Sequence, residues 1–193
     1  MGRKRGAPLT LDDVVEAAIA CLTEGGSKAL GINNVARVLG IRPPSLYHHV
    51  ASNEDLLQRV AIEGWRRLGA AMAERPSAPD PRASIQALAK AFRRFVSDHP
   101  SLYEVMSGTP LTDVPEFEPI ASAIMQDFAR VLATYGLQGD EVVHAVRMMR
   151  ASLHGFVLLE QTGQFGMPQS IEESFDWLIA HLDLSLERSA ARL

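Results

Sequence analysis

Cysteine is almost missing from this sequence, since Cys21 is the single one in 193 residues. One thiol can form neither an internal disulfide nor a cysteine-based zinc site, so neither of these can stabilise the fold. Aromatic residues are also few, at 6%, but 47% of the residues are hydrophobic. That fraction is enough for an apolar core, and it predicts an ordinary globular protein.

Segments that target or anchor a chain to membranes are not expected either. No stretch approaches the roughly 20 apolar residues that span a bilayer. The basic start, Met1–Gly6, is followed by Asp12, Asp13 and Glu16 where a secretory signal would be apolar, and position 6 is glycine rather than the Ser or Thr of a myristoylation signal. The sequence therefore predicts a cytoplasmic protein with no membrane partner.

Motifs of catalysis are lacking as well. The chain has no Gly-rich phosphate loop and no nucleophile elbow. Its histidines are scattered, and His144 and His154 do not have the i, i+4 spacing of a helical zinc site. An enzyme is the main alternative to a binding protein. Because these motifs are absent, the sequence predicts no enzymatic activity, no metal and no cofactor.

The net charge of −4 gives no general attraction for nucleic acid, but the charge is unevenly distributed. Residues 1–50 carry six basic and four acidic side chains, which leaves the rest of the chain with the whole negative excess. This asymmetry is compatible with a basic DNA-reading head on an acidic body.

Helical periodicity dominates the sequence, and no run alternates like a strand, so we expect an all-α fold. Thr10, followed by Asp13, is typical of a helix N-cap, and Gly25 and Gly26 end the apolar pattern that follows. Further helices are predicted over 32–39, closed by Gly40, and over 44–49. A longer helix opens at 52–55 and runs to residue 72.

The segment 75–82 has three prolines in eight residues and is the predicted boundary. It separates an N-terminal domain (1–52, with an arm at 1–8) and a connecting helix (53–74) from a C-terminal domain (82–193). In the latter, helices are expected near 82–98, 100–107, 117–135, 140–162 and 170–190, with a proline-punctuated loop at 110–119.

The segment Ile32–Val50 has the spacing of a helix-turn-helix. Ala36 provides a small residue where two helices cross, Gly40 permits the positive φ of the turn, and Leu46 points back into the core. The rest of the buried face is predicted to be Val35, Leu39, Ile41 and Val50. Any short helical hairpin shares some of these features, so spacing alone leaves both structures open.

The residues Leu46-Tyr47-His48-His49-Val50, followed by Ser52-Asn53-Glu54-Asp55-Leu56-Leu57, resemble the signature of the TetR/AcrR family of transcriptional regulators. The resemblance covers about residues 9–60. It implies a three-helix DNA-binding domain, a connecting helix, and a helical bundle that binds a ligand and forms a homodimer.

The resemblance also implies which residues contact double-stranded DNA. Arg42 is the candidate for guanine, Ser45 for a base edge or phosphate, and Tyr47 and His49 for phosphates, although Tyr47 also fits a packing role. Helix N-termini at Thr10 and Ile32 would bind phosphates, and the basic arm would enter a minor groove unless it is a solvated tail. The full set is Arg3, Lys4, Arg5, Thr10, Asn33, Arg42, Pro43, Ser45, Tyr47, His48, His49 and Asn53.

Two positions depart from the family pattern. Gly31 stands where Ser or Thr often caps the second helix, and Asn53 stands where lysine is common. Both changes remove phosphate contacts, and Asn33 and Asn34 are expected to compensate in part.

For the C-terminal domain the resemblance implies a cavity for an unknown small-molecule effector. The candidate ligand-binding residues are Phe92, Phe95, Met106, Met125, Phe128, Met149, His154 and Phe156, which would otherwise be ordinary core. Residues 150–168 are similar to the Trp-His-Gly subgroup, with Leu153 in place of the Trp and His154-Gly155 retained. His154 fits either a ligand contact or a hydrogen-bonded core histidine, and Gly155 fits close helix packing or room for a ligand.

The two last predicted helices carry apolar stripes that fit either an intersubunit four-helix bundle or an intrachain core. The stripes are Val142, Val146, Met149, Leu153 and Phe156, and Ile171, Phe175, Leu178, Leu182 and Leu186. The resemblance favours the homodimer, which would bind a palindromic operator. We therefore expect a repressor that a ligand releases from DNA; an activator, or a DNA-binding protein of this fold that senses nothing, is the alternative.

Overall fold

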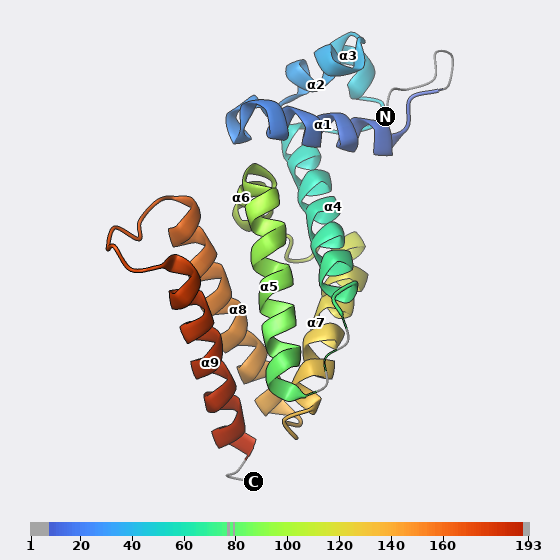
Figure 1. Cartoon of the computed structure of the whole chain (residues 1–193). Coiled ribbons are helices and arrows are strands. Elements are labelled where there is room, and N and C mark those ends of the chain that lie inside the picture. Colours follow the sequence, from blue (N-terminus) through green and yellow to red (C-terminus); the bar gives the residue numbers. More distant parts are fainter. Residues whose placement is uncertain (1–7, 77, 79, 191–193) are drawn as a thin grey trace. The chain divides into compact units, whose positions relative to one another are not determined.

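The computed structural model describes residues 8–76, 78 and 80–190, and within these ranges every regular element is a helix. The all-α prediction is therefore confirmed. The elements are α1 (Leu11–Gly25), η1 (Ser27–Ala29), α2 (Ile32–Leu39), α3 (Pro43–Leu46), α4 (Asn53–Ala73), α5 (Pro81–Asp98), α6 (Pro100–Gly108), η2 (Pro115–Phe117), α7 (Glu118–Ala133), α8 (Asp140–Gln161) and α9 (Ile171–Ala190) (Figure 1).

The helices form two compact units that are interleaved in the chain. Of the described residues, 8–67 and 99–118 form the N-terminal unit, and 68–98 and 119–190 with their gaps form the C-terminal unit. The packing thus divides within α4 rather than at the proline-rich segment 75–82. One reason is that the guanidinium of Arg75 pairs with the buried carboxylate of Asp127 in α7, which fixes the end of α4 to the C-terminal unit.

Helix α1 begins as the sequence predicts. The Asp13 amide donates to Thr10 Oγ1 at 3.2 Å, and the Thr10 amide donates to Asp13 Oδ2 at 2.9 Å, which is a reciprocal capping box. The helix ends at Gly26, whose φ of 72° suits a residue without a Cβ.

The turn between α2 and α3 is closed by Gly40, which lies in the left-handed region at φ 67° and ψ 32°. The Ile41 amide reaches back to the Ala36 carbonyl at 3.0 Å, a bond typical of glycine-terminated helices. Helix α3 begins at Pro43, one residue before the predicted start, and ends at Leu46 rather than at His49. Beyond Leu46 the chain continues as a turn, in which the amides of His49 and Val50 both donate to the Leu46 carbonyl.

The core of the helix-turn-helix is close to the predicted one. Val35, Ala36, Leu46 and Val50 are each at most 1% exposed. Leu39 and Ile41, however, are only half-buried, so their prediction as core residues was wrong. Both flank Gly40, and a tight turn leaves the side chains beside it at the edge of the hairpin.

Helix α6 belongs to the N-terminal unit although it lies far along the chain. It approaches α4 at Gly64, where a Cβ would stand 2.6 Å from the Met106 side chain. The Trp65 ring meets the Tyr103 ring edge-on, with centroids 6.5 Å apart. Glycine and aromatic packing together hold α6 against the first part of α4.

In the C-terminal unit α5 packs against both α8 and α9, which also pack against each other (Figure 1). Arg93 of α5 joins all three helices: it donates to Glu160 of α8 at 2.6 and 2.9 Å and to Glu172 of α9 at 2.5 Å. Its guanidinium also lies 4.5 Å from the centre of the Phe175 ring. The hydrogen bonds to Glu160 are the main reason why the pKa of Arg93 is raised.

A second polar link lies deeper in this unit. The Tyr135 hydroxyl donates to the buried carboxylate of Asp183 in α9 at 2.6 Å. Burial first, and the Asp183 carboxylate second, raise the pKa of Tyr135 far above its ordinary value. The phenol therefore keeps its proton, and the hydrogen bond that fixes α9 is maintained.

The predicted apolar stripes of α8 and α9 face the unit's own core. Val146, Met149 and Leu153 are buried, and so are Phe175, Leu182 and Leu186. Other apolar side chains are exposed instead: Val143, Met148, Leu158 and Leu159 on α8, and Trp177 and Leu184 on α9. Of the two interpretations left open for the stripes, burial therefore favours the intrachain core, although Val142, Phe156, Ile171 and Leu178 are only half-buried.

One helix of the described residues is long and apolar enough to cross a membrane by length and composition alone. This is α8, and a core helix passes the same test. Its buried side packs against α5 and α9. The helix is apolar on two sides: one faces the core of the unit, and the other is exposed.

Candidate nucleic-acid interface

Helix α3 is anchored from inside and polar outside. Leu46 is fully buried, whereas Arg42, Ser45 and His48 are exposed and Tyr47 is 56% exposed. Pro43 and His49 are half-buried at the margins. The short helix therefore turns one side chain inward and presents cationic, hydroxyl and imidazole groups to solvent, which are groups that bind base edges and phosphates.

The N-terminus of α1 is largely occupied by its own side chains. The Thr10 hydroxyl accepts from the Asp13 amide and donates to the Asp13 carboxylate at 2.8 Å. Asp12 adds a second negative charge in the first turn. Only backbone N–H groups of this terminus remain available to a phosphate. The two carboxylates would repel a phosphate that approaches them.

The start of α2 has no side-chain cap, as Gly31 leads one to expect. The Asn34 amide nitrogen donates to the Ala29 carbonyl at 2.9 Å, which fixes α2 to η1. Asn34 is thus occupied within the fold, while Asn33 is exposed. Any compensation for the lost cap is left to Asn33.

The start of α4 likewise caps itself. The Asp55 amide donates to Ser52 Oγ at 3.2 Å, and the Ala51 amide donates to Asp55 Oδ2 at 2.7 Å. A hydrogen bond with Ser52, followed by one from its own backbone amide, lowers the pKa of Glu54. Asn53 is exposed, but its neighbours in the chain are the acidic residues Glu54 and Asp55 rather than basic ones.

Two further cations of the N-terminal unit were not selected from the sequence as DNA contacts. Lys28 in η1 and Arg37 in the last turn of α2 are exposed. Both lie within the first 50 residues, whose excess of positive charge could have identified them as candidates. The predicted arm residues Arg3, Lys4 and Arg5 lie outside the described residues.

The predicted ligand-binding residues are only partly brought together. Phe92, Phe95, Phe128 and Met149 are buried, whereas Met125 is 39% exposed. Met106 lies in the N-terminal unit, against Gly64. His154 and Phe156 are half-buried.

An aromatic cluster forms around one of these residues. The Phe156 ring is 4.9 Å from Phe165 and 5.1 Å from Phe175, measured between ring centres. Phe165 belongs to the loop between α8 and α9, and sequence spacing alone did not select it as a partner of Phe156.

A helix-turn-helix that exposes its second helix, joined to a separate helical unit, defines a class: DNA-binding transcriptional regulators, which are not enzymes. Residues 14–60 match the family described as bacterial regulatory proteins, tetR family. Residues 85–182 match a tetracyclin repressor-like C-terminal domain. The chain belongs to the TetR family.

Relatives with assigned names agree with this membership. An uncharacterised HTH-type transcriptional regulator of Mycobacterium tuberculosis is 36% identical over 167 residues, which cover 82% of this chain and 73% of that protein. The tetracycline repressor protein class E of Escherichia coli is 28% identical over 159 residues, covering 80% of this chain and 70% of the repressor.

Solved structures show the same fold. Apo ActR from Streptomyces coelicolor superimposes with a TM-score of 0.77 at 18% identity, covering 96% of this chain and 98% of ActR. A TetR variant from Acinetobacter baumannii, in complex with minocycline, gives a TM-score of 0.70 at 24% identity, covering 95% of this chain and 99% of the variant.

Proposed function

We propose that this chain is a repressor that binds a palindromic operator as a homodimer and leaves it when a small molecule binds the C-terminal unit. The observation that carries the DNA-binding half is the exposed polar face of α3 around the buried Leu46. The name of the Escherichia coli relative supports repression. The minocycline complex of the Acinetobacter baumannii protein supports control by a ligand.

In this proposal the exposed residues divide the work at DNA. Arg42 forms a bidentate pair with guanine, and Ser45 and His48 reach base edges. Pro43 sets the start of the helix, Tyr47 and His49 bind phosphates, and Thr10, Asn33 and Asn53 fix the register through helix starts. Arg3, Lys4 and Arg5 enter the minor groove beside the site.

Amide NMR of the labelled chain with a short DNA duplex of mixed sequence, at low salt, tests this face without knowledge of the operator. We expect the amide signals of Arg42 and of residues 45–49 to shift, because phosphate contacts dominate non-specific binding. The amides of Glu187 and Ser189, at the end of α9, serve as the control and should stay in place. Shifts confined to the C-terminal unit would contradict the proposal.

The homodimer is proposed on the exposed apolar side chains of the C-terminal unit. We define the dimer face as Met148, Ala151, Gly155 and Leu158 of α8 with Trp177, His181 and Leu184 of α9. Their helical spacing places each set on one side of its helix. A Cβ at Gly155 would touch nothing within 4 Å, so the chain's own packing does not require glycine there. A helix of a second copy would provide a reason for it.

The aromatic part of this face is the most exposed. Trp177 is 64% exposed and stacks on the His181 ring, with centres 3.7 Å apart. An exposed tryptophan together with other exposed apolar side chains is typical of an interface.

Sedimentation equilibrium distinguishes a dimer from a monomer. We expect the native chain to be a dimer, and Trp177→Asp with Leu184→Asp to be a folded monomer, since both side chains are outside the core. Glu173→Gln, exposed on the same helix, is the matched control and should leave the dimer intact. A native monomer would contradict the proposal.

Ligand control is tested in the protein–DNA complex. Compounds that raise the melting temperature of the chain, with minocycline among the first tried, are titrated against bound DNA. An effector should lower DNA affinity because it favours a state with wrongly spaced heads. A compound that binds the C-terminal unit and leaves DNA affinity unchanged contradicts release and favours the non-sensing alternative, whereas tighter binding favours an activator.

Two further expectations stay proposals. A regulator of this class must reach DNA, so we place the protein in the cytoplasm. The likeness of residues 150–168 to the Trp-His-Gly subgroup remains a prediction, because the matching C-terminal family is described only as tetracyclin repressor-like.

A further inference from the structure

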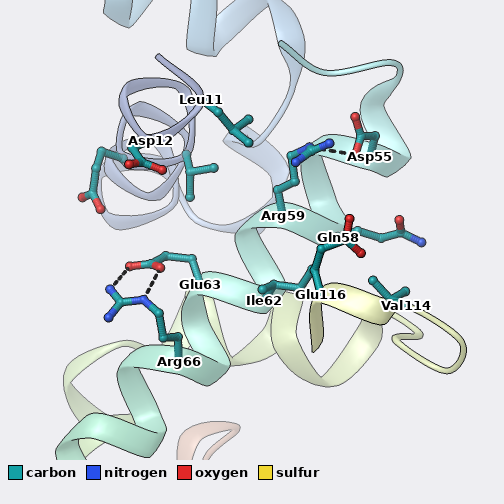
Figure 2. A pocket seen from close by; sticks show the side chains of 12 residues that line it. Leu11, Asp12, Asp55, Gln58, Arg59, Ile62, Glu63, Arg66, Val114 and Glu116 are labelled. Atoms are coloured by element: carbon teal, nitrogen blue, oxygen red, sulfur yellow. Dashed lines mark hydrogen bonds and ion pairs between the residues drawn. The ribbon is translucent and has the colours of Figure 1, made fainter. Parts of the chain in front are cut away.

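The N-terminal unit contains a cleft that none of the DNA contacts uses. It has a volume of about 450 Å³ and lies along α4, between α1 and the segment 114–116. Figure 2 shows its lining, with Leu11 and Asp12 on α1 and with Val114 and Glu116 on the other wall. A cleft of this size is within the range of small-molecule sites and is much larger than a single inorganic ion.

The cleft has apolar lining from three separate segments. Leu11 and Val15 come from α1, Ile62 from α4, and Val114 from the segment before η2. Such side chains stabilise the aliphatic part of a ligand by burial, at about 0.8 kcal/mol per CH₂ group. They offer nothing to Mg²⁺ or Ca²⁺, which require oxygen ligands all round.

The charged lining is strongly unbalanced. Five carboxylates line the cleft, against the two guanidiniums of Arg59 and Arg66. Each cation has an anionic neighbour: Arg59 Nε lies 2.8 Å from Asp55 Oδ1 in an ion pair without a hydrogen bond, and Arg66 pairs with Glu63 at 2.6 Å (Figure 2). Burial opposes the ionisation of Glu63, but hydrogen bonds from Arg66 and Arg67 outweigh it and lower its pKa.

Two carboxylates form no ion pair. Glu16 pairs with Arg67, whereas Asp12 and Glu116 have no ion-pair partner among the described residues; Asp12 is still near enough to Arg66 to help raise the pKa of its guanidinium. Asp12 lies on α1 and Glu116 on η2, so they stand on different walls of the same cleft, and both are exposed (Figure 2). The excess of negative charge disfavours an anionic ligand and favours a cationic one.

We propose that this cleft binds an organic cation with an aliphatic body, of the alkylamine or alkyldiamine class, whose ammonium groups pair with Asp12 and Glu116 while its methylene chain lies on Leu11, Val15, Ile62 and Val114. The site belongs to the DNA-binding unit and is separate from the effector site proposed for the C-terminal unit. It also stands independently of that proposal, because it rests on the lining of the cleft alone.

The probe is hexane-1,6-diamine, and hexane-1,6-diol is its uncharged control of equal length. Methyl NMR of the full-length protein should show shifts at Ile62 and Val114 with the diamine. Calorimetry or the same titration should give an affinity about five- to tenfold higher for the diamine than for the diol, as expected for two solvent-accessible ion pairs.

The variant Asp12→Asn with Glu116→Gln should reduce the diamine affinity to that of the diol. Its matched control is Glu24→Gln with Glu104→Gln, which removes two exposed carboxylates of the same unit outside the cleft and should leave the affinity unchanged. Equal binding of diamine and diol by the native chain overturns the proposal, whether or not the variants fold. Methyl shifts confined to residues outside the cleft lining, or equal losses in both double variants, also overturn it, because they indicate non-specific attraction to surface charge.

Discussion

The two units of this protein use their surfaces in opposite ways. The N-terminal unit buries its apolar residues around Leu46 and exposes Arg42, Ser45 and His48 on α3. The C-terminal unit also has a closed core, yet it leaves Trp177, Leu158 and Leu184 exposed. This difference agrees with the proposed partners, which are a polar one for the first unit and an apolar one for the second.

The largest expected effect tests the inside of the N-terminal unit. Leu46→Ala removes the only inward side chain of α3 and should lower the free energy of unfolding by about 2–5 kcal/mol. Urea denaturation followed by circular dichroism measures it. Met167→Ala is the control in the other unit; at 75% exposed, and outside the proposed dimer face, it should change the stability little. Similar losses of unfolding free energy in both variants would show that the buried Leu46 stabilises the fold no more than an exposed side chain does.

The next effect tests the link between three helices of the C-terminal unit. Arg93→Met leaves Glu160 and Glu172 without their partner and should cost about 2–3 kcal/mol, given that the Arg93 side chain is 17% exposed. The neighbouring Arg94 is 85% exposed, so Arg94→Met should be nearly neutral. Equal stability of the two variants in thermal melts would show that the Arg93 contacts add nothing.

A smaller effect concerns function rather than stability. Arg42→Ala should weaken binding to the specific DNA site by about 1–3 kcal/mol and leave the unfolding transition unchanged, because Arg42 is exposed. Fluorescence anisotropy on the specific site and on random DNA measures the difference. An equal loss on both DNAs would assign Arg42 to phosphate rather than to a base.

The smallest effect concerns the start of α1. Thr10→Ala removes the capping hydroxyl and should destabilise the N-terminal unit by about 1 kcal/mol, while Thr10→Ser should restore most of it. Hydrogen exchange of the α1 amides follows the change locally. If Thr10→Ala is silent, the Asp13 carboxylate alone is sufficient to cap the helix.

The same contrast explains what the sequence could predict. Helix starts and turns depend on neighbours in the chain, so Thr10 with Asp13, and Gly40 after α2, were identified from sequence and found in place. The inward position of Leu46 followed from helical spacing in the same way.

Contacts between distant segments were not predictable in this way. Met106 was grouped with the ligand candidates, but it packs on Gly64 across more than 40 residues of sequence. The stripes of α8 and α9 had the right periodicity for two structures, and only packing against α5 assigned them to the core. Asn34 bonds to the Ala29 carbonyl, a contact that depends on how α2 meets η1 rather than on helical spacing.

The proposal that α3 reads DNA within a symmetric dimer can be tested by selecting bound duplexes from a random DNA library, with the native chain and Arg42→Ala in parallel. We expect the native chain to enrich a two-fold symmetric site with half-sites about one or more helical turns apart, and Arg42→Ala to lose preference at one position of each half-site. No enrichment by the native chain, or an asymmetric site that Arg42→Ala selects equally well, would contradict it.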